Sequence, residues 1–114
     1  MTLIQNSNIT VMISHMDTSI RFYTETLGLK LKTRYGDHWA EIEAPGLTIG
    51  LHPTFNPVIK GNNLQIGFRV ENLQQAIASL EAKGVRFQQM DDQKISIAFF
   101  TDPDGNLLYL GQPG

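Results

Sequence analysis

The chain has 114 residues, with nine Lys and Arg against eleven Asp and Glu, no cysteine and three histidines. This length suits one compact domain or two half-sized lobes, and the lack of cysteine excludes disulfides, zinc ribbons and thiol nucleophiles. A net charge of −2 argues against a basic nucleic-acid-binding face. No apolar run approaches the roughly 18 residues of a membrane helix. The N-terminus lacks the pattern of a signal peptide, so the sequence predicts a cytoplasmic protein with neither a nucleic-acid nor a membrane partner.

The first half of the chain alternates between strand and helix patterns. Apolar and polar residues alternate through 9–13, which predicts a half-buried strand. Asp17 is a candidate helix cap, and apolar residues then recur at helical spacing until Gly28. Turn residues divide the rest of this half into short alternating segments. The resulting order is β-α-β-β-β, with the last three strands predicted at 29–35, 38–44 and 47–52.

The same order of elements restarts after a segment with two prolines, 53–62, which we interpret as a linker. The second helix is predicted to be capped by Asn72 and ended by Gly84. The two aspartates of the turn at 102–105 are expected to shape the loop rather than to catalyse. The strands of this half are predicted at 65–70, 85–90, 95–101 and 106–110.

The two halves align on each other. Ile20 falls on Ile77 at an offset of 57, and Gly46–Leu51 falls on Gly105–Leu110 at an offset of 59. This internal duplication predicts an α+β fold with two tandem βαβββ modules, about 5–52 and 63–112, in a single domain of residues 1–114. Because one helix covers only one face of each sheet, we expect a curved, mostly antiparallel eight-stranded sheet around a trough.

Alternation along the strands assigns side chains to the helix face or to the trough. Apolar residues such as Ile42, Ile49 and Phe99 are expected under the helices. A mixture of aromatic and polar residues in the trough is typical of a small-molecule pocket, but it fits a partly wet core or a dimer interface equally well. The predicted trough residues include Met12, Trp39, Glu41, His52, Gln65, Arg69, Ala98, Phe100 and Tyr109.

Each candidate in the trough has two interpretations. Trp39 and Phe100 are platforms on which a planar ligand can stack, although Trp39 is equally suited to packing at an interface. Arg69 can pair with an anionic ligand or with Glu41 across the trough. Tyr109 can donate a hydrogen bond to a ligand or simply fill space.

The runs FYTETLGL (22–29) and FFTDPDGN (99–106), together with the paired modules, resemble the vicinal oxygen chelate superfamily. That superfamily includes glyoxalase I, extradiol dioxygenases, fosfomycin-resistance transferases and bleomycin-resistance proteins. The resemblance implies metal ligands at the start of the first strand and within the last strand of each module. Those positions hold no His or carboxylate in this chain, which therefore resembles the metal-free bleomycin- and mitomycin-resistance branch. The four positions at which the resemblance implies metal ligands are Asn8, Gly50, Gln65 and Tyr109.

Three hypotheses follow. The first is a metal-independent protein that binds a planar or aromatic small molecule, without a cofactor. The second is a glyoxalase-type lyase or dioxygenase that holds a divalent metal with Glu41, His52 and water, while His15 and His38 lie in loops. The third is a non-catalytic dimerisation or interaction domain. A homodimer is expected in each case, with modules paired within one chain or exchanged between chains. Under the first hypothesis, the small molecule contacts Met12, Trp39, Glu41, His52, Gln65, Arg69, Phe100 and Tyr109.

Overall fold

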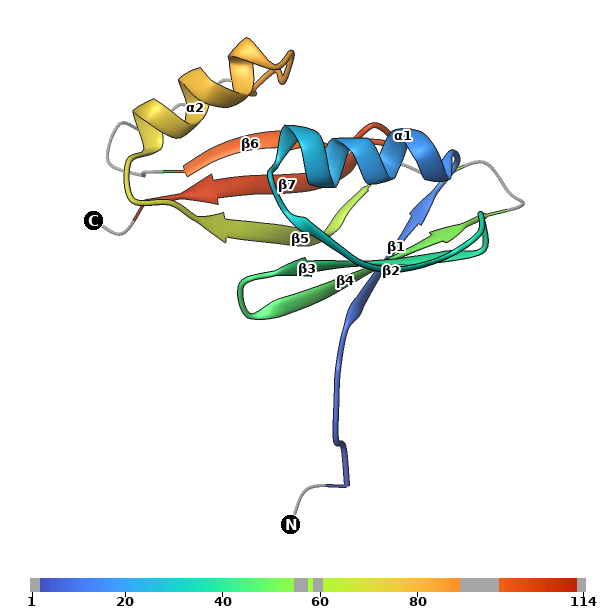
Figure 1. The fold of residues 1–114 in the computed structure, drawn as a ribbon. Coiled ribbons are helices and arrows are strands. Elements are labelled where there is room, and N and C mark those ends of the chain that lie inside the picture. The colour runs from blue at the N-terminus through green and yellow to red at the C-terminus, as the bar shows by residue number, and fades with distance from the viewer. Residues whose placement is uncertain (1–2, 55–57, 59–60, 89–96, 113–114) are drawn as a thin grey trace. The chain divides into compact units, whose positions relative to one another are not determined.

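The computed structural model describes residues 3–54, 58, 61–88 and 97–112 (Figure 1). The chain divides into two compact units, Met1–Val58 and Ile59–Gly114, and the boundary lies inside the predicted linker. Each unit has its own sheet and its own main helix. Among the described residues, none of the helices has the length and apolar character needed to cross a membrane.

The first unit contains a four-stranded sheet, sheet A, with the strand order β1-β4-β3-β2. β1 and β4 pair in parallel, whereas β3 pairs antiparallel with both β4 and β2. The prediction of four strands in this half is confirmed. The short turn at Pro45–Gly46 joins β3 to β4 in a register that places Glu41 opposite Gly50. The strands are β1 (Ile9–Ile13), β2 (Lys30–Tyr35), β3 (Trp39–Ala44) and β4 (Leu47–Pro53).

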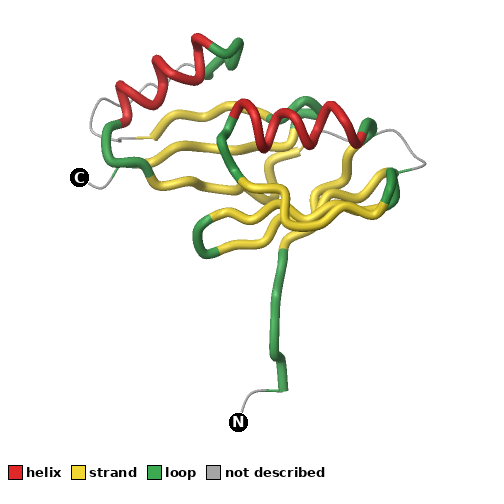
Figure 2. Tube along the Cα trace, in the orientation of Figure 1, coloured by secondary structure: helices red, strands yellow, loops and turns green. Residues whose placement is uncertain are grey.

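The helix of the first unit changes its hydrogen-bonding pattern halfway along. α1 (Met16–Arg21) continues into the π-helical segment η1 (Phe22–Thr26), and the two form one continuous rod (Figure 2). The Leu27 N–H donates to the carbonyl of Phe22 at 3.0 Å, a bond that spans five residues instead of four. Gly28 then adopts a φ of 77°, so the predicted glycine stop is confirmed.

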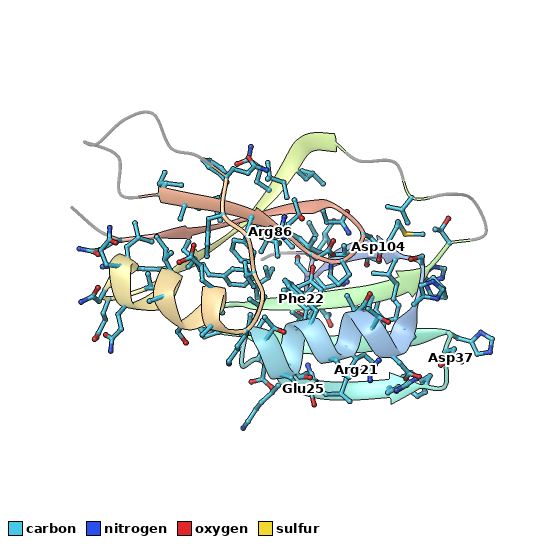
Figure 3. The ribbon with its side chains drawn as sticks, turned by 90° about the horizontal axis from the view of Figure 1, so that it is seen from above. Arg21, Phe22, Glu25, Asp37, Arg86 and Asp104 are labelled. Atoms are coloured by element: carbon cyan, nitrogen blue, oxygen red, sulfur yellow. The ribbon has the colours of Figure 1, made fainter. Side chains whose placement is uncertain are left out.

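The prediction that Asp17 caps α1 is wrong. His15 occupies the cap position, and its side chain makes no capping hydrogen bond. Asp17 lies one residue inside the first turn, where its carboxylate accepts from the Arg34 guanidinium at 2.7 Å. Arg34 also binds Asp37, in the turn after β2, at 2.8 Å. Figure 3 labels Asp37 in this turn. Hydrogen bonds to Asp17 and then Asp37 raise the pKa of Arg34. The ion pair with Asp17 ties β2 to α1.

Sheet A separates an apolar face from a mixed one. The face under α1 and η1 is buried together with Ile20 and Tyr23 of that helical rod. Its sheet residues are Val11, Ile13, Ala40, Ile42, Ile49 and Leu51, as the alternation predicts. We call the opposite side the open face of sheet A; its residues include Thr10, Met12, Tyr35, Trp39, Glu41, Gly50 and His52.

The second unit contains a three-stranded sheet, sheet B, with the strand order β5-β7-β6. Its helix, α2 (Leu73–Ala82), begins after Asn72, whose side chain accepts a hydrogen bond from the Gln75 N–H at 3.0 Å. Gly84 follows the helix with a φ of 95°. The predicted cap and stop of this helix are therefore confirmed. The strands are β5 (Gly61–Arg69), β6 (Ile97–Thr101) and β7 (Asn106–Gly111).

Two predicted boundaries in the second half need correction. Residues 85–88 do not form a strand, although the Gln88 N–H donates to the carbonyl of Phe99 at 2.8 Å. The linker is shorter than 53–62, because Pro53 belongs to β4 and Gly61 begins β5. The remainder of these predictions, at 55–57, 59–60, 89–90 and 95–96, lies outside the described residues. Within the described residues there are seven strands, and one eight-stranded sheet around a trough stays a prediction.

The predicted orientation of β6 is also wrong. Phe100 lies opposite Leu108 of β7, and residues directly opposite each other share one face. Phe100 is fully buried and its ring lies 5.3 Å from that of Phe87, so it belongs to the core, as does Ala98. Phe99 instead shares a face with Tyr109. Consecutive apolar residues in β6 hid the phase of the strand, and packing against the rest of the core decided it.

The turn between β6 and β7 matches its prediction. Asp102 is buried, and one of its carboxylate oxygens accepts from the backbone N–H groups of Asp104 at 3.0 Å and Asn106 at 2.8 Å. Asp104 lies in the turn itself (Figure 3). Asp102 therefore organises the loop that leads into β7.

Candidate functional site

Four side chains form a row across all four strands of the open face of sheet A. Tyr35 lies opposite Trp39, and Met12 lies beside His52. The Trp39 and His52 rings join these pairs, with centroids 6.2 Å apart and planes inclined by 63°. Since neighbouring strands are about 4.8 Å apart, three intervals give a length of about 14 Å. We call these four residues the aromatic row of sheet A.

Gly50 lies next to this row, on β4 between Thr10 and Glu41. A Cβ atom at Gly50 would overlap the six-membered ring of Trp39. The indole therefore occupies the space that a side chain at position 50 would need. Only glycine permits this approach, so β4 and the Trp39 ring define one packed surface.

The position of the Trp39 ring is held by a carboxylate on its own strand. The indole Nε1–H donates to Oε2 of Glu41 at 3.1 Å, and both side chains are half-buried. Within the described part of the chain, Glu41 forms no ion pair. The second carboxylate oxygen of Glu41 is thus a charged acceptor on this face, beside the Trp39 ring.

A hollow of about 500 Å³ lies at the β3–β4 turn end of the first unit. Its lining includes one cationic side chain, Lys32, and one anionic side chain, Glu43. Asn8, at the family metal-ligand position that precedes β1, also lines it, and its side-chain amide donates to Thr10 Oγ1 at 3.2 Å.

The second unit shows a related arrangement on sheet B. Tyr109 of β7 lies opposite Gly67 of β5 and opposite Phe99 of β6. A Cβ at Gly67 would overlap the Tyr109 ring, and the Phe99 and Tyr109 centroids are 5.7 Å apart. Gln65 and Arg69 are exposed on β5 to either side of Gly67. The predicted pairing of Arg69 with Glu41 would join the two units and stays a prediction.

The four family positions do not suit a transition metal. Asn8 and Gln65 offer neutral amides, Gly50 offers no side chain, and Tyr109 offers a phenol that covers Gly67. These are poor donors for zinc, iron or nickel, which favour imidazole, thiolate and carboxylate. Among residues 3–54, 58, 61–88 and 97–112, no three His, Asp or Glu side chains come together. Glu41 and His52 share the open face, but among the described residues no third His, Asp or Glu side chain forms a metal-binding cluster with them.

The structure sorts the predicted site residues into two groups and a remainder. Met12, Trp39, Glu41 and His52 lie together on sheet A, whereas Gln65, Arg69 and Tyr109 lie on one face of sheet B. Phe100 is excluded from that face by its burial in the core. The predictions for His15 and His38 are confirmed, since both are exposed and lie outside the helices and strands.

Sequence reasoning missed two aromatic residues of these faces. Tyr35 ends β2 and enters the row because β2 and β3 pair across the short turn at Gly36–Asp37. The turn itself was a sufficient signal, because a hairpin places the strand ends opposite each other. Phe99 had no such local signal, since it adjoins another phenylalanine.

Each unit has a helix on one face of a mixed sheet. In both sheets the first strand lies at the edge and pairs in parallel with the last strand of the unit, so the chain is a duplicated α+β module. A family model described as the glyoxalase/bleomycin resistance protein/dioxygenase superfamily matches residues 7–110, and the chain belongs to this superfamily.

Proteins similar to this chain have names that indicate different functions. The chain is 30% identical over 134 aligned positions to a lactoylglutathione lyase of Schizosaccharomyces pombe, which covers 88% of the chain but 44% of that enzyme. It is similar in structure to TnmS3, an antibiotic-binding protein from Streptomyces sp. CB03234 (TM-score 0.70, 23% identity, 99% of this chain and 100% of the other). A fosfomycin resistance protein from Listeria monocytogenes has a TM-score of 0.80 at 14% identity, with 99% and 94% covered. At these identities, the two structures show a shared fold.

Proposed function

We propose that this protein binds a small organic molecule without a metal ion, and that the open face of sheet A is a principal contact surface. The observation that supports this most directly is the Trp39 ring over Gly50. At a family metal-ligand position the chain has a glycine, and an aromatic surface replaces the donor. An indole surface favours flat, apolar molecules, through stacking and apolar burial.

Within this proposal each residue has a distinct role. Trp39 supplies the stacking surface, with Met12 and His52 extending it along the row. Glu41 positions the indole and accepts a hydrogen bond from the ligand. On sheet B, Gln65, Arg69 and Tyr109 are the corresponding polar and aromatic contacts. TnmS3 is an antibiotic-binding protein, which is compatible with this assignment.

Equilibrium dialysis of chelator-treated protein tests the proposal. The probes are three flat molecules: 9-aminoacridine (a cation), menadione (neutral) and anthraquinone-2-sulfonate (an anion). We expect saturable binding of at least one probe, with a change in the emission of Trp39, the only tryptophan of the chain. Trp39→Leu should weaken binding about tenfold, or about 1.4 kcal/mol.

The matched control is Phe22→Leu, which removes an aromatic ring from η1, away from the open face (Figure 3). It should change the affinity less than twofold. Failure of all three probes to bind, or equal losses in the two variants, would contradict the proposal. Addition of zinc, nickel or iron should leave binding unchanged. Metal-dependent lyase activity would instead favour a function like that of the fission yeast lactoylglutathione lyase.

We further propose that the protein is a homodimer. The large apolar residues exposed in the described part of the first unit include Tyr35 and Leu31, which are 64% and 43% exposed, and a second copy would cover such surface. Light scattering coupled to size-exclusion chromatography should give twice the 12.8 kDa chain mass. A monomeric mass over the accessible concentration range would contradict this proposal.

A further inference from the structure

We propose that the ligand of the open face of sheet A is a flat organic cation, whose positive group binds the free oxygen of Glu41 while its ring system lies along the aromatic row. This inference rests on the proposed function and adds the charge of the ligand to it. Its basis is the placement of one anchored carboxylate at the edge of one indole ring.

The carboxylate of Glu41 favours a cationic donor. Glu41 is half-buried, and one of its oxygens accepts from Trp39 Nε1 at 3.1 Å. A partly desolvated carboxylate is most favourable when it receives a charge-assisted hydrogen bond. In the described residues no Lys or Arg supplies one to Glu41. A cationic donor on the ligand would complete the coordination of the free oxygen.

The indole ring of Trp39 favours a cation as well. The face of an indole is electron-rich, and a cation near it is attracted by the ring quadrupole. The hydrogen bond to Glu41 adds negative charge beside that ring and keeps it on Gly50. The ring and the carboxylate therefore favour the same sign of charge in the ligand.

The other side chains on the open face of sheet A fit the same ligand. The row through Tyr35, Trp39, His52 and Met12 is about 14 Å long, from strand spacing, which suits a molecule of two or three fused rings. The row next to the aromatic row contains Thr10, Gly50 and Glu41. Among the side chains of these two rows, Glu41 is the one that carries a formal charge. The cation Lys32 lines the hollow toward the hairpin turn, where Glu43 also lies.

Direct comparison of the three probes tests the sign of the charge. Wild-type protein should bind 9-aminoacridine about tenfold more tightly than menadione, and menadione more tightly than anthraquinone-2-sulfonate. Affinity for the cation should fall when sodium chloride is raised, whereas affinity for menadione should not.

Two isosteric variants separate the role of Glu41 from a general effect of charge. Glu41→Gln keeps an acceptor for the indole N–H but removes the charge, and should lower affinity for 9-aminoacridine about tenfold while leaving menadione within twofold. Glu25→Gln removes the same charge from η1 and should have less than a twofold effect (Figure 3). An unchanged Trp39 emission maximum in Glu41→Gln verifies that the ring has kept its place.

The outcomes distinguish this inference from the proposed function. Equal or tighter binding of anthraquinone-2-sulfonate, or unchanged binding of 9-aminoacridine by Glu41→Gln, would overturn the cationic assignment and leave small-molecule binding standing. Absence of binding by all three probes would overturn both.

Discussion

Each unit places an aromatic ring over a glycine, and one equivalent position of the repeat is the glycine in the first unit and the ring in the second. In sheet A the glycine is Gly50, between Thr10 and Glu41. In sheet B the equivalent position is Tyr109, between Gly67 and Phe99. At the first position the residue is covered by a ring from the next strand, and at the second it is itself the covering ring.

Both units therefore present a ring packed on a glycine, although different positions of the repeat supply the two residues. A ring beside a residue with a full side chain would collide, so each ring needs a glycine partner on the neighbouring strand. The surroundings nevertheless differ. The Trp39 ring is held by a hydrogen bond to Glu41, whereas Tyr109 is held by packing against Phe99.

The helices differ in a similar way. At an offset of 57, His15 falls on Asn72 and Ser19 falls on Ala76. Asn72 caps its helix, and His15 does not. Ser19 is fully buried, and within the described residues its hydroxyl has no hydrogen-bond partner. The first unit therefore lacks two stabilising features that the second one has, and substitutions can transfer them.

The largest effect is expected at the glycines. Gly67→Ala should lower the free energy of unfolding by about 1–3 kcal/mol, because the added Cβ meets a ring that Phe99 confines. Gly50→Ala should cost about 1 kcal/mol, because a movement of the Trp39 ring that makes room for the Cβ disturbs its hydrogen bond to Glu41. Urea denaturation measures both changes.

A double-mutant cycle provides the control for this comparison. Tyr109→Ala removes the collision, so the Gly67→Ala and Tyr109→Ala changes should be non-additive by about 1 kcal/mol. Arg69→Ala, at an exposed position two residues further along β5, should stay within about 0.5 kcal/mol of wild type. A Gly67→Ala variant as stable as Arg69→Ala would show that the ring does not need the glycine.

The helix caps should give an intermediate effect of opposite sign in the two units. Asn72→Ala removes an observed cap and should destabilise the protein by about 1 kcal/mol. His15→Asn installs the equivalent acceptor and should stabilise it by about 0.5–1 kcal/mol. Thermal and urea unfolding report both changes, and a destabilised His15→Asn variant would break the proposed equivalence of the two helix starts.

The smallest effect is expected at the buried hydroxyl of α1. Ser19→Ala gives the first helix the residue of its counterpart and should raise the free energy of unfolding by up to about 1 kcal/mol. Thr18→Ala, an exposed position next to it, measures the contribution of helix propensity alone. If the two variants have the same stability, the unpartnered hydroxyl has no cost.

Local chemistry in the sequence was sufficient for most of the fold. The left-handed glycines at 28 and 84, the Asn72 cap and the Asp102 turn depend on residues a few positions apart, and each was predicted. The register of β3 and β4 followed from a two-residue turn. The duplication itself needed only a comparison of the two halves.

Tertiary structure decided the features that depend on distant partners. Asp17 lies inside the first turn of α1 rather than at its cap, and its carboxylate binds Arg34 of β2, which is distant in the sequence. The phase of β6 was set by the core around Phe100, since alternation cannot orient consecutive apolar residues. The sequence alone determined that Gly50 and Tyr109 are not metal ligands of the usual kind. Only the structure shows what replaces them, because a ring meets a glycine through strand pairing and side-chain direction, which no short stretch of sequence specifies.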